Sequence, residues 1–132
     1  MNKSIKEREV QSLNIQIFAS FLYLGVISVS IILLENSKRV IQNKTPIFKI
    51  DDKLNILLLN RIVALVIVGM FLYASYQNIE VAKLKGQELE SFYLEFISST
   101  LSSLSSIIVL IVALRAFDNN SFSLANLENT EN

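Results

Sequence analysis

Three long apolar stretches constrain the fold of this chain more than any other feature of its sequence. The first, Val10 to Leu34, carries no charge and would be about 38 Å long as a helix, more than the ~30 Å of a bilayer's hydrocarbon core. The second, Leu54 to Ile79, contains one charge, Arg61, and the third, Phe96 to Leu114, is uncharged. The hydrocarbon core contains no water, so the backbone N–H and C=O groups of a spanning segment must form hydrogen bonds within the chain, as they do in a helix. These stretches therefore predict three transmembrane helices.

Turn and capping signals outside these stretches predict an all-α integral membrane protein, a small bundle of three helices in a single membrane domain, 1–132. Pro46 cannot lie inside a continuous helix, and Gly86 tolerates the left-handed conformation that often follows a helix end. A tight turn at Gly86 is therefore expected to join the second and third helices. The expected segments are helix 5–34, loop 35–51, helix 52–85, helix 87–117 and a mobile polar tail, 118–132.

The composition excludes most enzyme chemistry and predicts that nucleic acid is not a partner. Cys and His are both absent, which removes thiol nucleophiles, imidazole bases and the usual nitrogen and sulfur ligands of metals. Twelve Lys and Arg balance twelve Asp and Glu, so no excess of positive charge would attract phosphate backbones. We therefore expect a protein that is not an enzyme and that has no catalytic residues, metal site or cofactor.

Arg61 is the most informative charge because it lies inside an apolar stretch. Placing an Arg at the centre of a transmembrane helix costs about 2.5 to 3.5 kcal/mol. Arg61 is near the start of its stretch, so its long side chain can extend to the lipid headgroups. The alternatives are a pairing with Glu35, at the end of the first helix, or a position facing a polar cavity.

A cluster of serines at the start of the third stretch is the second candidate feature. Two rows have the spacing i, i+4, i+7 and together form one broad helix face: Ser98, Ser102 and Ser105, and Ser99, Ser103 and Ser106. The other face carries Ile97, Leu101, Leu104 and Ile108. Serines allow helices to approach closely, so this face predicts a packing seam within or between chains. Alternatively, it lines a polar path through an oligomer.

These observations predict a multi-pass membrane protein that associates with itself or with a larger membrane complex, with the lipid bilayer as its surroundings. The alternative is an oligomeric pore-former or small transport protein, which resembles phage holins in size and number of spans; the tail lacks the basic cluster often seen in holins. A composition rich in Ile, Asn, Lys and Ser suggests a bacterial cell membrane. Seven Lys and Arg on the loop side against five on the other leave the orientation open.

Overall fold

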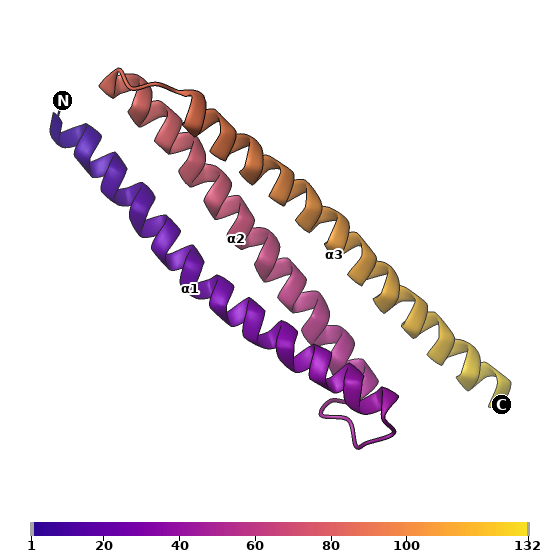
Figure 1. Ribbon diagram of the computed structural model, residues 1–132. Helices are drawn as coiled ribbons and strands as arrows, with labels where there is room; N and C mark the ends of the chain where they lie inside the picture. The colour runs from indigo at the N-terminus through magenta and orange to yellow at the C-terminus, as the bar shows by residue number, and fades with distance from the viewer. Residues whose placement is uncertain (1, 132) are drawn as a thin grey trace.

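The computed structural model describes the backbone of residues 2–131 and the side chains of residues 4–119. It consists of three long antiparallel helices, α1 (Asn2–Ile41), α2 (Ile50–Lys85) and α3 (Glu90–Glu131). The α2–α3 turn lies beside the start of α1, and the α1–α2 loop lies at the opposite end of the molecule (Figure 1). Each helix is long and apolar enough to cross a membrane. The prediction of an all-α chain with three helices of this kind is therefore confirmed.

The helix α2 is the central element of the fold. The helices α1 and α3 lie on its two sides, and both pack against it (Figure 1). In the described parts of α1 and α3, no Cα atom of one helix lies within 8 Å of a Cα atom of the other. The chain is therefore an open layer of three helices, in which only the middle one has two neighbours.

Buried residues recur at every seventh position on the facing sides of α1 and α2. The buried positions are Ser12, Ala19, Val26 and Leu33 on α1, and Asn60, Ile67, Ala74 and Val81 on α2. A seven-residue repeat keeps such residues along one stripe of each helix, which is the pattern of coiled-coil packing and of most transmembrane bundles. At the centre, Ala19, Val26 and Ile67 form the hydrophobic core.

The helices α1 and α2 end in the same backbone motif. In α1, Asn43 adopts a left-handed conformation (φ 58°), and the N–H groups of Asn43 and Lys44 donate to the carbonyls of Val40 and Arg39. In α2, Gly86 has φ 69°, and the N–H groups of residues 86 and 87 donate to the carbonyls of residues 83 and 82. This is the Schellman arrangement, which satisfies carbonyls at a helix end.

Five of the six expected helix ends differ from the structure. The helices α1 and α2 begin slightly earlier than expected, at Asn2 and Ile50 instead of residues 5 and 52. The first helix continues to Ile41 instead of ending at residue 34, so part of the segment expected to be loop, 35–51, is helical. Its first stop signal is Asn43, whose left-handed conformation closes the helix; an acid or amide such as Glu35 or Asn36 does not by itself end a helix. The helix α3 begins at Glu90 and continues to Glu131, through most of the expected mobile tail; no Gly or Pro follows Gly86 to interrupt it. Asn132 lies outside the described residues.

Candidate functional site

The structure places the two serine rows of α3 in different surroundings, except that Ser106 of the row facing α2 also lines the groove described below. Ser99, Ser103 and Ser106 are partly buried on the side that faces α2. The Oγ atoms of Ser99 and of Ser75, a buried residue of α2, are 2.9 Å apart and share a hydrogen bond. These three serines lie with Phe92, Phe96, Leu110, Ala113 and Phe117 on one stripe of α3. They are part of a packing seam within the chain.

The second row, Ser98, Ser102 and Ser105, is exposed and lines a groove of about 690 Å³, which we call the serine groove. Its floor is α2, at Arg61, Ala64 and Val68, and Tyr23 of α1 contributes to its far side. Leu94, Ile97, Leu101 and Val109 border it as well. Ile97 and Leu101, expected on the opposite face of α3 from the serines, therefore lie beside them. The groove exists because α1 and α3 both pack on α2 while their backbones stay apart.

Arg61 lies at the edge of the serine groove and is partly buried. It also borders a smaller cavity between α1 and α2, next to Ser37, Lys53 and Leu57. Side chains on a helix lean toward its N-terminus, which for Arg61 is the end that carries the α1–α2 loop. Among the side chains that the structure describes, none forms an ion pair or hydrogen bond with Arg61.

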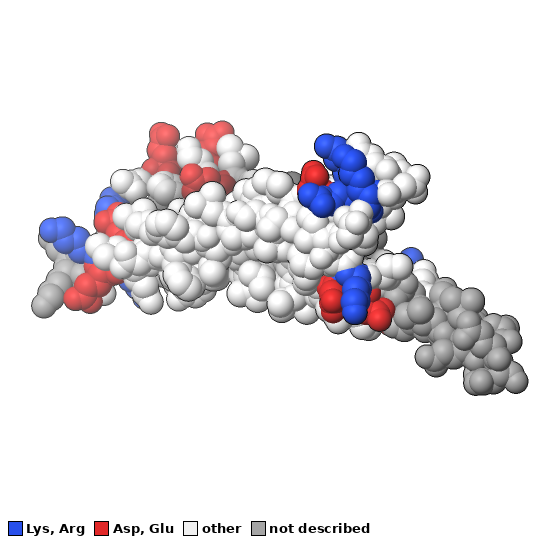
Figure 2. Space-filling model, turned by 90° about the horizontal axis from the view of Figure 1, so that it is seen from below, with Lys and Arg blue, Asp and Glu red and all other residues white. Residues whose placement is uncertain are grey.

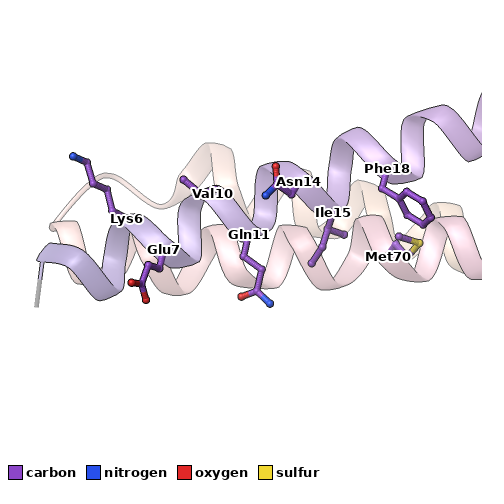
Figure 3. Close-up of a pocket in the computed structure, with 8 residues that line it drawn as sticks. All are labelled: Lys6, Glu7, Val10, Gln11, Asn14, Ile15, Phe18 and Met70. Atoms are coloured by element: carbon purple, nitrogen blue, oxygen red, sulfur yellow. The ribbon is translucent and has the colours of Figure 1, made fainter.

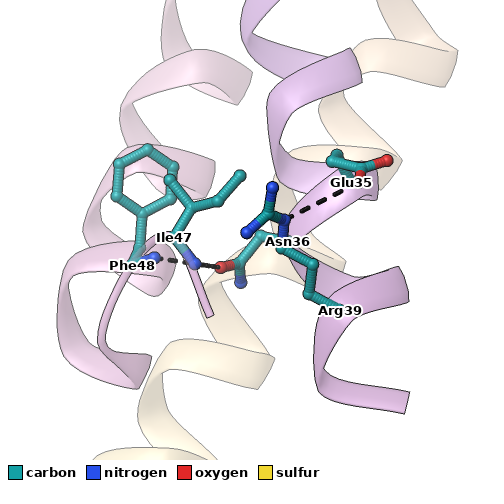
Figure 4. Close-up of polar contacts among 5 residues, drawn as sticks. All are labelled: Glu35, Asn36, Arg39, Ile47 and Phe48. Carbon is teal, nitrogen blue, oxygen red and sulfur yellow. Dashed lines mark hydrogen bonds and ion pairs between the residues drawn. The ribbon is translucent and has the colours of Figure 1, made fainter. Parts of the chain in front are cut away.

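Glu35, the other charge expected to be within or near the membrane, is not the partner of Arg61. Its carboxylate lies 3.7 Å from the guanidinium of Arg39, one turn further along α1, and both side chains are about half exposed (Figure 4). An exposed pair of this kind contributes little to stability. Arg61 therefore presents an unpaired cation to the serine groove and to the neighbouring cavity.

Two buried polar residues, Ser12 and Asn60, form hydrogen bonds between α1 and α2, and neither bond was anticipated from the sequence. Ser12 is 1% exposed and donates 2.8 Å to Oδ1 of Asn78. Nearer the loop, the Nδ2 of Asn60 lies 3.1 Å from the Oγ of Ser30 and 3.4 Å from the carbonyl of Val26. Hydrogen bonds between helices inside lipid fix their register. The sequence contains one indication of these contacts, because Ser12 and Asn60 stand seven residues before Ala19 and Ile67 and so continue the buried repeat of each helix.

A second groove runs along α1 near its start and reaches α2 at Met70. Lys6, Glu7 and Gln11 lie toward one end of it, and Phe18 lies beside Met70 of α2 at the other (Figure 3). Glu9, close by, forms an ion pair with Lys85 and so links the start of α1 to the end of α2. The lining of this second groove is therefore polar near the end of the molecule and becomes apolar toward the middle of the molecule.

Neither groove gathers the groups that catalysis or metal binding would need. In the described part of the chain there is no cluster of three or more residues that could hold a metal ion. The serine groove offers hydroxyls and one guanidinium, and the second groove offers amides together with Lys6 and Glu7. These groups can form hydrogen bonds and attract charged partners, but no activated nucleophile lies next to a base among them. The arrangement is suited to binding and packing.

The comparisons with known proteins give no relative from which a function could be transferred. No protein-family model, curated protein or solved structure matches this chain. Its function is therefore inferred from the geometry of its own residues.

Proposed function

We propose that this chain is a multi-pass membrane protein without catalytic activity, a helical component that associates with further copies of itself in the membrane. Membrane insertion is supported by the side chains that the fold leaves uncovered. No more than 17% of the most apolar window of any helix is buried within the chain. Residues as large as Phe21 and Leu34 are about 70% exposed. So much exposed apolar surface is compatible with lipid and far exceeds what a monomer shows in water.

The distribution of charge supports the same proposal. Lys, Arg, Asp and Glu gather toward the two ends of the molecule, and the middle of the face in Figure 2 is uncharged. Along α2, Arg61 and Glu80 are separated by about 28 Å, and along α3, Glu95 and Arg115 by about 30 Å. Both lengths match the ~30 Å hydrocarbon core of a bilayer. Arg61 is then about seven residues inside the loop-side end of its apolar stretch at Leu54, and its side chain leans toward the headgroups on that side.

Self-association is supported mainly by one observation, the serine groove. Three exposed hydroxyls and an unpaired guanidinium lie along a concave surface at the level of the apolar stretches. Lipid tails cannot satisfy these groups, whereas a helix can bring its own polar groups and pack closely against small residues. The α3 helix of a second copy carries the same serine row, so two copies can pair their serine faces.

Replacing Ser98 and Ser102 by Leu should weaken self-association about tenfold or more, because the added side chains fill the serine groove and remove two hydroxyls. The matched control replaces Ser20 and Ser28 by Leu. These two serines are also exposed in an apolar stretch, but they lie on α1 and donate only to carbonyls of their own helix. Energy transfer between labelled copies in liposomes measures the association constant. Equal association constants for both variants and the wild type would contradict the proposal.

The exposed serine row also favours a second candidate function, an oligomeric pore of the holin-like type. Several copies around an axis would place Ser98, Ser102 and Ser105 along a polar path, with Arg61 near one mouth. The same liposomes distinguish the two functions when they are loaded with a small ion. Ion leakage that the wild-type protein causes and the Ser98→Leu, Ser102→Leu variant does not cause would favour the pore. Self-association of the wild type without leakage would favour the self-associating helical component proposed above.

A further inference from the structure

A third cavity, of about 790 Å³, opens at the loop end of the molecule, and it belongs to neither groove described above. We call it the lysine pocket because Lys44, Lys49 and Lys53 line it. The remainder of its lining is amide and apolar, and it includes Asn36, Leu54 and, from α3, Ala116. Parts of all three helices and of the α1–α2 loop therefore meet around one cavity.

The loop that forms this pocket is held in place by Asn36. The side chain of Asn36 is 1% exposed, and its Oδ1 accepts hydrogen bonds from the backbone N–H groups of Ile47 and Phe48, at 2.8 and 2.9 Å (Figure 4). At the other end of the loop, Asn43 closes α1 through its left-handed conformation. The positions of Lys44 and Lys49 in the loop are thereby fixed on both sides, so the pocket exists before any ligand binds.

The charges around the lysine pocket are unbalanced. No carboxylate lines it, and within the described side chains none of its lysines forms an ion pair. Lys53 donates 3.0 Å to the hydroxyl of Ser37. The nearest acids in sequence, Asp51 and Asp52, are exposed and are not part of the lining, and Glu35 is paired with Arg39. Three lysines thus line one cavity whose lining contains no acid, although the ammonium of Lys53 is bound to Ser37, which borders the neighbouring cavity.

The N-terminus of α2 adds backbone donors beside these lysines. Its first residue, Ile50, lines the pocket, and the N-cap residue Lys49 makes no side-chain hydrogen bond to the helix. The first N–H groups of a helix have no partner within the helix and favour an anion. They add to the attraction that the three lysines exert on a phosphate group.

The position of the pocket determines which phosphate compound fits it. In the membrane architecture proposed above, on which this inference rests, the α1–α2 loop lies at the lipid surface. The lysines are then at headgroup level, and Val40, Leu54 and Ala116 provide an apolar side for an acyl chain. Basic pockets between helices at a membrane surface bind acidic headgroups in this way.

We propose that the lysine pocket is a binding site for an anionic phospholipid, with its phosphate at Lys44, Lys49 and Lys53 and an acyl chain against Leu54 and Ala116. In nanodiscs that contain phosphatidylglycerol and phosphatidylcholine, the wild-type chain should retain phosphatidylglycerol preferentially when it is released for native mass spectrometry. In the triple variant Lys44→Gln, Lys49→Gln, Lys53→Gln, the ratio of retained phosphatidylglycerol to phosphatidylcholine should fall by about tenfold or more.

The matched control removes three cations from the same end of the molecule without touching the pocket: Lys38→Gln, Arg39→Gln and Arg115→Gln. It should keep the preference for phosphatidylglycerol. An equal loss of the phosphatidylglycerol preference in both variants would overturn the proposal, because the preference would then depend on the total positive charge at this end of the molecule and not on the pocket. Release of the lipid by millimolar inorganic phosphate would overturn it too, since the site would then be one for a soluble phosphate compound.

Failure of this site and failure of the membrane architecture give different results. A wild-type chain that enters nanodiscs and shows no lipid preference overturns the lysine pocket alone. A wild-type chain that does not enter nanodiscs overturns the architecture and the site together. Self-association through the serine groove is not needed for either result, since Ser98 and Ser102 lie outside the lysine pocket.

Discussion

Replacing Ile67 by Ala is expected to lower the free energy of unfolding of the helix bundle by about 2 kcal/mol. Ile67 is 1% exposed and packs in the core with Ala19 and Val26, so its truncation leaves a cavity at the centre of the α1–α2 interface. The loss is expected to be at the low end of the range for water-soluble proteins. A helix separated from its partner in a membrane is still covered by lipid, and only the lost packing counts.

Reversible unfolding in mixed detergent micelles measures this difference. The control is Ile62→Ala, since Ile62 lies on the same helix and is 43% exposed, outward from the core. Its replacement should change the free energy of unfolding by less than about 0.5 kcal/mol. Equal losses at the two positions would contradict the assignment of Ile67 to the centre of the core.

Replacing Asn36 by Ala is expected to lower the free energy of unfolding by about 2 to 3 kcal/mol, because it leaves two backbone N–H groups of the loop without an acceptor. Asn36→Asp retains an oxygen that can accept from both groups and should recover part of the loss. The control, Asn55→Ala, removes an exposed amide from α2 and should have little effect.

The same variants make a second, local measurement possible. Hydrogen exchange at the amides of Ile47 and Phe48 should be much faster in Asn36→Ala than in the wild type, and it should be unchanged in Asn55→Ala. Unchanged exchange in Asn36→Ala would show that the loop is held by other contacts. In that case, Asn36 would not be the residue that preforms the lysine pocket.

The three helices could be predicted from the sequence because apolar length is a property of each segment alone. Helix ends were less predictable. The apolar stretch before Glu35 ends well before α1 does, because a helix can continue in water until a residue such as Asn43 adopts a left-handed conformation. For the same reason, α3 runs past Phe117.

The functional features depend on how helices face one another, which the spacing of one helix does not determine. The six serines of α3 share one broad face in sequence, yet Ser99 meets Ser75 of α2 and Ser102 faces the groove. The lysine pocket could not be predicted at all. It requires Lys44 and Lys53 to be brought together with Ala116, which lies on a helix distant in sequence.

The most direct test of the account is side-selective labelling of single cysteines in the chain, which has none of its own. Thr45→Cys in the α1–α2 loop, Glu88→Cys in the α2–α3 turn and Asn119→Cys on α3 are labelled in intact membrane vesicles with an impermeant maleimide. If the chain crosses the membrane three times, positions 45 and 119 lie on one side and position 88 on the other. Positions 45 and 119 should then be labelled to the same extent. Position 88 should be labelled only in the chains of opposite orientation, so the labelled fractions at positions 45 and 88 should add up to one. Full labelling of positions 45 and 88 from the same side would contradict the account.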